Sequence, residues 1–362
     1  MTNSPAAEIN PALPAGTTGP LREYVGVFHV HTAYSDSAGR MPYVVDCAKR
    51  AGLDYVVVCD HNTLASKREG WEGWHDGVLL AIAVEVTSLK GHAVVFGLDR
   101  CAEWRHAHPD EYLPQVEQMG GVSFIAHPER SSRGKLYHKP QAWPHLRTDC
   151  YAGIEIWSYM HDWVEWAFPW HPIQGVRDPD AGIAGPHPAV LRNWDEVATR
   201  RHIAGVGALD AHEIRFPWRY LKWFLFRVLP TEFLFRTART HVLTPEWSGD
   251  AVADVAALVD ALAAGHCFCS HGLVGDAAGT RFVARRGDDV ALMGDEVAAG
   301  DEREFVATLP EEAEITLRRN SEAVAQAEGR ELVHRDARPG VYRIEARRHN
   351  RPWVFTNHIY VR

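Results

Sequence analysis

Histidine and carboxylate side chains recur at the ends of predicted β-strands in this sequence. Histidine is the side chain that most often binds metals and transfers protons near neutral pH, and the chain contains 21 of them. Mixed histidine and carboxylate ligands suit Zn, Mn or Fe, and the absence of cysteine from the set disfavours a structural zinc site. The set is His29, His31, Asp36, Asp60, His61, Glu85, His127, Asp210 and His212, with His92 at the start of a further strand.

The spacing within this set directs pairs of side chains to one point. Side chains two residues apart in an extended strand point the same way, so His29 and His31 can reach one ion cluster. Asp210 and His212 have the same spacing. A single pair is a weak indication, but such residues at several strand ends of one chain strongly indicate a metal cluster.

The elements that must position these residues alternate between strands and helices up to about residue 270. Pro42 near the start and Gly52 after the end are typical of a helix over 41–51. Alternating strands and helices predict a parallel sheet or barrel, in which the carboxyl ends of the strands meet on one face. The predicted strands are 24–28, 53–59, 78–84, 92–97, 122–126, 153–157 and 203–209, and the further helices are 110–119, 193–200 and 250–264.

Beyond Gly279 the pattern changes to short alternating strands separated by Gly, Asp and Asn turns. A helix pattern interrupts them only at 323–326, which predicts a small antiparallel β-sandwich. We therefore expect a flexible leader over 1–23, a catalytic unit over 24–275 and a sandwich-like domain over 276–362. The strands expected in that domain are 280–286, 304–309, 314–319, 340–347 and 353–361.

Composition limits the possible partners and the compartment. A net charge of −9 disfavours a protein that coats nucleic acid, and no apolar run has membrane-spanning length. The first twenty residues contain no Lys or Arg and no apolar segment of the kind found in secretory signals. The cysteines form no C-x-x-C pair and are expected to be reduced thiols, so we expect a cytoplasmic protein.

Taken together, these motifs resemble the PHP (polymerase and histidinol phosphatase) superfamily over residues 24–215. The resemblance lies in the order and spacing of His29-Val-His31, Asp36, Asp60-His61, Glu85, His92, Ala126-His127-Pro128 and Asp210-Ala-His212. It implies an α/β fold with a distorted (βα)7 barrel, and two or three divalent ions (Zn, Mn or Fe) at its C-terminal mouth. The closing sequence RPWVFTNHIYV resembles the branch that contains carbaryl hydrolase.

The resemblance also implies roles for single residues. Glu85 is expected to bridge two ions and, with Asp36 and His212, to lie closest to the chemistry, while Asp60 orients a ligand. The implied ligand groups are His29, His31 and Asp210 for one ion, Asp36, His61 and His212 for a second, and Glu85, His92 and His127 for a third.

Several of these residues also allow an ordinary structural interpretation. Asp36 could cap a turn, His92 could be a structural residue at a strand start, and His212 could cap a helix or face solvent. Arg130 and Tyr34 are candidates for substrate binding, although a surface salt bridge would equally explain Arg130. The remaining histidines, His161 among them, are expected to be surface or structural residues.

The segment 213–240 is basic and aromatic, and Trp218, Leu221, Leu225 and Val228 fall at helical spacing. Three interpretations remain open: an insertion helix that walls the active site, a homodimer contact, or an interfacial membrane anchor.

The predicted function is a metal-dependent phosphoester hydrolase that acts on a small anionic or ester substrate through a hydroxide bridging two ions. The same ligands would serve a carbamate, ester or amide hydrolase, because the same nucleophile attacks a carbonyl group. A non-catalytic PHP-type metal-binding module is the alternative from another class. An extended nucleic acid is not expected as a partner.

Overall fold

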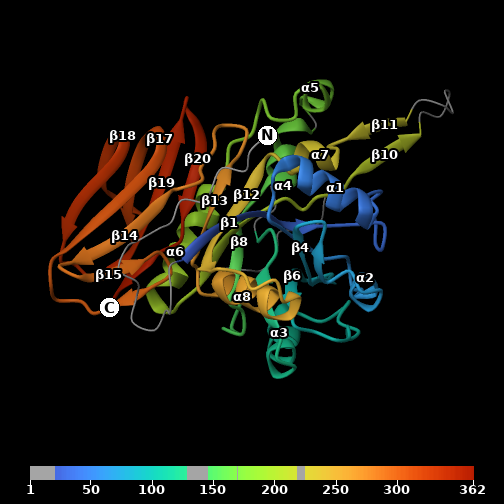
Figure 1. Ribbon diagram of the computed structural model, residues 1–362, viewed down its shortest axis with the longest axis horizontal. Helices are drawn as coiled ribbons and strands as arrows, with labels where there is room; N and C mark the ends of the chain where they lie inside the picture. The colour runs from blue at the N-terminus through green and yellow to red at the C-terminus, as the bar shows by residue number, and fades with distance from the viewer. Residues whose placement is uncertain (1–20, 129–145, 169, 218–224) are drawn as a thin grey trace.

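The computed structural model describes residues 21–128, 146–168, 170–217 and 225–362, and it shows a mixed α/β protein dominated by two sheets (Figure 1). The larger sheet contains β1 (Leu21–Val30), β2 (Tyr55–Val58), β3 (Gly73–His75), β4 (Val78–Ile82), β12 (Ala238–Pro245) and β13 (Cys267–His271), together with the C-terminal strands given below. The smaller sheet runs in the order β5 (Val84–Ser88), β6 (Gly91–Phe96), β7 (Val122–Ile125), β8 (Gly153–Ser158) and β9 (Ala204–Ala208).

The smaller sheet meets the larger one at the carboxyl ends of β1 and β2, without forming one continuous barrel. Isolated bridges join Val30 to Ala211 on one side and His61 to Glu85 on the other. Side chains such as Phe28, Val57 and Phe124 fill the space between the sheets. The strand order therefore gives two open sheets held together at the site, and a closed (βα)7 barrel is not evident from it.

The directions of the strands explain in part why the chain forms two open sheets and not a parallel barrel. The pairs β1–β2, β2–β4, β7–β8 and β8–β9 are parallel, as the alternating pattern predicts. In contrast, β5 pairs with β6 and β6 with β7 in antiparallel fashion. Only Leu89 and Lys90 separate β5 from β6, and a two-residue connection can join only antiparallel strands.

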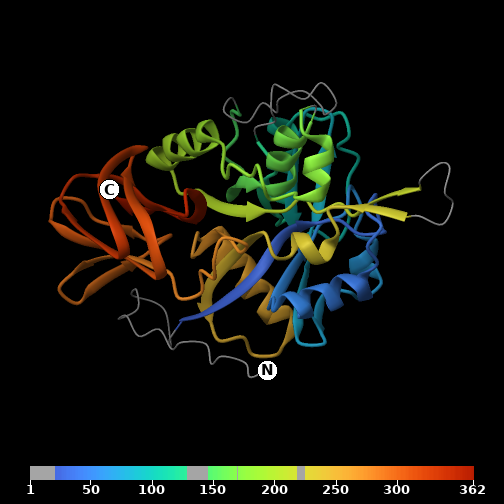
Figure 2. The same cartoon turned by 90° about the horizontal axis from the view of Figure 1, so that it is seen from above.

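Helices cover the outer faces of both sheets (Figure 2). The four helices predicted before residue 270 are present, and α1 ends at Gly52, whose φ of 68° suits glycine. α6 begins earlier than expected because Pro188 occupies its first turn and the side chain of His187 caps it. The helices are α1 (Met41–Ala51), α2 (Ala65–Arg68), α3 (Pro109–Gln118), α4 (Tyr159–Ala167), α5 (Pro172–Arg177), α6 (Pro188–Arg200), α7 (Thr231–Leu234) and α8 (Ala251–Ala263).

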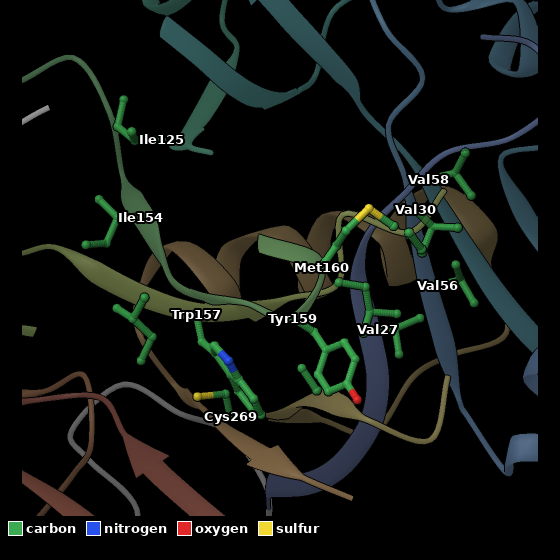
Figure 3. Packing of buried hydrophobic residues seen from close by; sticks show 14 of the residues in the cluster. Val27, Val30, Val56, Val58, Ile125, Ile154, Trp157, Tyr159, Met160 and Cys269 are labelled. Carbon is green, nitrogen blue, oxygen red and sulfur yellow. The ribbon is translucent and has the colours of Figure 1, made fainter. Parts of the chain in front are cut away.

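The first turn of α4 packs against the interior of the protein. Figure 3 shows Tyr159 and Met160 facing Val27 and Val30 of β1, and Trp157 beside Cys269 of β13. Because these side chains fix the start of α4, they also fix the direction of the residues that follow in its first turn.

The C-terminal strands continue the larger sheet through the pairing of β13 with β20. The predicted helix at 323–326 is wrong, because these residues belong to β18, which pairs with β17 along most of its length. The strands are β14 (Arg281–Arg286), β15 (Asp289–Leu292), β16 (Glu296–Val297), β17 (Arg303–Arg319), β18 (Glu322–Asp336), β19 (Gly340–Arg348), β20 (Arg351–Thr356) and β21 (Ile359–Val361).

Part of the basic segment 213–240 forms two short strands, although its apolar residues fall at helical spacing. β10 (Ile214–Pro217) and β11 (Leu225–Val228) pair in antiparallel fashion as a separate two-stranded sheet that projects from the body (Figure 1). Large apolar residues alternate with Arg215 and Arg227 there, a period that suits strands. Residues 218–224 lie outside the described part. A homodimer contact through segment 213–240 stays a prediction. The cytoplasmic location of the protein stays a prediction as well.

Among the described helices, none combines the length and the apolar character that crossing a membrane requires.

Glu23 links β1 to β12 and to the start of β14, and it makes stability depend on pH. Its carboxylate accepts hydrogen bonds from Nδ1 of His241 at 2.8 Å, Nη1 of Arg281 at 2.6 Å and the amide of Gly279 at 3.0 Å. Burial alone would raise the pKa of Glu23, but His241 and Arg281 outweigh burial and lower it from 4.5 to about 2. The stabilisation is therefore complete above pH 4.5 and is lost as the pH falls toward 2.

We expect Glu23→Gln to lower the free energy of unfolding at pH 7 by roughly 3 kcal/mol, since a lowered pKa corresponds to about 1.4 kcal/mol per unit. Urea unfolding from pH 7 to pH 3 should show a shallower loss of stability for the variant than for the native protein. Glu246→Gln, at an exposed ion pair with Arg22, is the control. Parallel curves for the native protein and Glu23→Gln would contradict this linkage.

Candidate metal centre

The site lies where the carboxyl ends of β1, β2, β7 and β9 meet β5. Its innermost side chains are buried: His29 and Glu85 are fully covered, and His31 and His127 nearly so. The Nε2 atoms of His29 and His31 face each other at 3.0 Å. The strand-end spacing therefore does bring these side chains to one point.

Three of the residues hold strained backbone conformations that redirect their side chains. His29, His127 and Asp210 have φ values of 68°, 29° and 52°, in the left-handed region that non-glycine residues rarely adopt. Each such residue costs about 1–3 kcal/mol, so the surrounding structure must enforce it. Ala211 does so on one side, since its amide donates to the carbonyl of His29 and its carbonyl accepts from the amide of His31.

Glu85 is the carboxylate on which most imidazoles converge. Oε1 lies 2.9 Å from Nδ1 of His92 and 3.2 Å from Nε2 of His127, and Oε2 lies 2.5 Å from Nδ1 of His61. Burial would raise the pKa of Glu85, but the surrounding histidines, His29 foremost, hold it well below its usual range. The carboxylate is therefore ionised and central, as expected for a residue shared between ions.

Asp210 gathers a second group of imidazoles. Oδ1 lies 3.4 Å from Nε2 of His29, 3.3 Å from Nε2 of His31 and 3.3 Å from Nδ1 of His212. Oδ2 lies 3.3 Å from Nδ1 of His161. Burial opposes ionisation, but the charges of His29 and His212 hold the pKa of Asp210 well below its usual range.

The outer rim is formed by Asp36, His61 and His212. The Asp36 carboxylate lies 3.3 Å from Nε2 of His61 and 3.1 Å from Nε2 of His212, and its side chain is 54% exposed. Burial would lower the pKa of His61, but the adjacent carboxylates of Asp36 and Glu85 raise it to about 10. The rim is thus the side from which solvent reaches the site.

The buried donors fit a divalent ion. Burial lowers the pKa of His31 and His127 to about 4, which keeps both imidazoles in the neutral form that binds metal. The Nδ1 atoms of both rings and Oε2 of Glu85 are buried without a hydrogen-bond partner, since the close approach of His61 to Oε2 lies outside hydrogen-bond geometry. Unpartnered buried lone pairs next to ionised carboxylates suit a cation.

The described residues form four groups whose ligand atoms lie within 4.8 Å of one another, and the implied assignment of ligands to single ions stays a prediction. His92 belongs to none of them, although its Nδ1 contacts Glu85. Asp210 groups with His127 and His161, although it also lies near His29 and His31. The groups are His31, Asp36, His61 and His212; His29, Glu85 and His127; His127, His161 and Asp210; and His29, His31 and Cys59.

His161 and Glu155 are site residues that the sequence pattern missed. His161, expected at the surface or in a structural role, lies in the first turn of α4 directly after β8, the one parallel strand to which no ligand had been assigned. Glu155 is 1% exposed within β8, where its Oε1 accepts from Nδ1 of His29 at 2.5 Å and its Oε2 from the amide of His127 at 2.7 Å. A carboxylate within the apolar run Gly-Ile-Glu-Ile-Trp is the feature that could have revealed it.

Asp60 holds the loop that carries Asp36. Its carboxylate accepts hydrogen bonds from the amide of Thr32 at 2.8 Å, from Oγ1 of Thr32 at 2.7 Å and from Oγ of Ser35 at 2.6 Å. It thus orients this loop, whereas the expectation from sequence was that it orients a ligand directly.

The two candidates for substrate binding stay predictions. The Tyr34 hydroxyl donates a hydrogen bond to Glu69, outside the donor groups. Arg130 lies outside the described residues.

Comparison with known proteins gives remote similarity. No family model matches the sequence. An uncharacterised protein of Methanocaldococcus jannaschii is 25% identical over 112 residues, which are 28% of this chain and 65% of that protein. The match therefore spans just under two thirds of that relative.

The comparison with solved structures gives two remote matches. One is a two-domain protein from Bacteroides vulgatus that contains a predicted PHP-like metal-dependent phosphoesterase; it has a TM-score of 0.46 and 14% identity over 99% of this chain and all of that one. The other is a candidate metal-dependent phosphoesterase from Bifidobacterium adolescentis, with a TM-score of 0.35 and 15% identity over 51% of this chain and 87% of that one.

We expect Glu155→Gln to weaken divalent metal binding roughly 10- to 100-fold, the usual effect of losing a carboxylate that orients a ligand. The glutamine has one acceptor oxygen, so its NH2 group would face either the ring N–H of His29 or the amide of His127. Chelator competition with Mn²⁺ or Zn²⁺ measures the affinity, and Glu196→Gln, at an exposed helix pair, is the control. Equal affinities in the two variants would remove Glu155 from the site.

Proposed function

We propose that this protein is a metal-dependent phosphoester hydrolase with a site for two or three divalent ions. The observation that carries the proposal is the overlap of the donor groups, since His29, His31 and His127 each belong to two of them. Overlapping groups would bring ion positions side by side, and paired ions are the arrangement that clamps the attacking and leaving oxygens of a phosphoester. The structural similarities are too remote to add to this argument.

Three of the four donor groups would each hold one ion. His29, Glu85 and His127 would hold a fully buried ion, and His31, Asp36, His61 and His212 an ion at the rim. His127, His161 and Asp210 would complete a third position. Divalent ions, when bound, lower the pKa of coordinated water and polarise phosphoryl oxygens.

The chain's own groups set the charge and the direction of approach. Glu85 and Asp210 supply buried negative charge that favours cations over protons. Asp36, exposed at the rim, holds His61 and His212 in place beside the entrance. A small substrate therefore approaches over Asp36, and Tyr34, two residues away, is the proposed substrate contact.

The activity can be tested on p-nitrophenyl substrates with protein reconstituted with Mn²⁺ or Zn²⁺. We expect turnover of a phosphate monoester, diester or triester, and a loss of at least roughly 10³-fold in His29→Ala, because that substitution removes a ligand from two donor groups. His106→Ala, at an exposed position outside the groups, is the control and should retain full activity.

The same panel includes a carboxylic ester and an aryl carbamate. Turnover of these substrates alone, lost in His29→Ala, would replace the phosphoesterase by a carbonyl hydrolase on the same metal site. Stoichiometric metal without turnover of any substrate would favour a non-catalytic metal-binding module.

A further inference from the structure

Cys59 lies at the floor of the metal centre. It follows β2 directly and is two residues before His61, so strand periodicity turns both side chains toward the interior. Its thiol is fully buried, and its sulfur and one ring nitrogen each of His29 and His31 lie within 4.8 Å of one another. Among the described cysteines, it is the only one that belongs to a donor group.

A second observation points into the same space. Oε2 of Glu85 is fully buried without a hydrogen-bond partner and lies 3.7 Å from Nε2 of His29 and 3.5 Å from Nε2 of His31. The other ring nitrogen of His29, Nδ1, donates a hydrogen bond to Glu155 at 2.5 Å, so Nε2 is the nitrogen that can bind an ion. The sulfur of Cys59 thus lies close to His29 and His31, and Oε2 of Glu85 lies beside the same two imidazoles.

We propose that Cys59 is a sulfur ligand of the buried ion that His29, Glu85 and His127 would hold, and that it gives this position a preference for thiophilic ions such as Zn²⁺, Co²⁺ and Cd²⁺ over Mn²⁺. This inference rests on the metal centre of the proposed function and adds a donor of a different chemical type to it. Thiolate is a soft ligand and selects these ions, whereas carboxylate and imidazole alone discriminate less. The S–H proton leaves for solvent as the sulfur–metal bond forms, and no oxidant or reductant is required.

A cysteine that serves only packing would behave differently. Free cysteines are often buried as small apolar residues, and Cys59 does contact the apolar interior. Cys47 is an example of that kind, buried in α1 and outside every donor group. It therefore provides the matched control.

Optical spectroscopy of the Co²⁺-loaded protein separates the two roles. We expect an intense near-ultraviolet thiolate-to-cobalt charge-transfer band in the native protein, retained in Cys47→Ser and lost in Cys59→Ser. The weaker visible bands should persist in Cys59→Ser, since the other ligands remain. Chelator competition should show that Cys59→Ser lowers the preference for Cd²⁺ over Mn²⁺ by roughly tenfold or more.

The outcomes distinguish this inference from the proposed function. A native protein that binds Co²⁺ stoichiometrically without the charge-transfer band overturns the role of Cys59 and leaves the metal centre intact, whatever the stability of the variant. Equal losses of Cd²⁺ and Mn²⁺ affinity in Cys59→Ser would overturn it as well. A native protein that binds no Co²⁺, Zn²⁺ or Mn²⁺ would overturn the metal-dependent function itself.

Discussion

Buried negative charge is the constraint on which the site depends. Glu85, Glu155 and Asp210 are all at least nine-tenths buried, and burying an ionised carboxylate is costly unless hydrogen bonds and opposite charge compensate it. Here the compensation comes from imidazole rings at 2.5–3.7 Å, which hold the pKa values of Glu85 and Asp210 far below normal. The site therefore contains buried electron-pair donors and negative charge that divalent ions are suited to bind.

The same constraint explains the strained backbone around the site. Left-handed conformations at His29, His127 and Asp210 cost free energy, yet they turn side chains from three different strands toward the carboxylates. They persist because neighbouring groups fix them: Ala211 bonds the backbone on both sides of Val30, and Glu155 accepts from the His127 amide. The backbone where the two sheets meet is therefore held rigidly, and this rigidity helps to position the donor side chains.

The C-terminal strands contribute to that rigidity from a distance. Asp195 of α6 accepts hydrogen bonds from Nε of Arg343 at 2.6 Å and from Nε2 of His358 at 2.7 Å, in a buried network that ties the helix to the C-terminal part of the larger sheet. Because α6 leads into β9, and β9 leads into Asp210, this network supports the loop that carries the site. Removing one partner of such a buried pair leaves an uncompensated charge.

The sequence by itself determined the local features of this protein. Strand periodicity predicted that His29 and His31 share a direction, and the strand-end pattern identified His61, Glu85, His127, Asp210 and His212 as neighbours, because these relations depend on two-residue spacing and on how parallel strands end. Helix α1 followed from Pro42 and Gly52.

Tertiary structure alone decided which residues distant in the sequence join the predicted metal ligands. Glu155 reaches His29 across 126 residues, and the positions of His161 and Cys59 beside the other donors depend on how the two sheets and α4 pack. The two paired strands within 214–228 have the same origin, since the apolar residues of this segment fit both periods and only the pairing of distant backbone groups selects one.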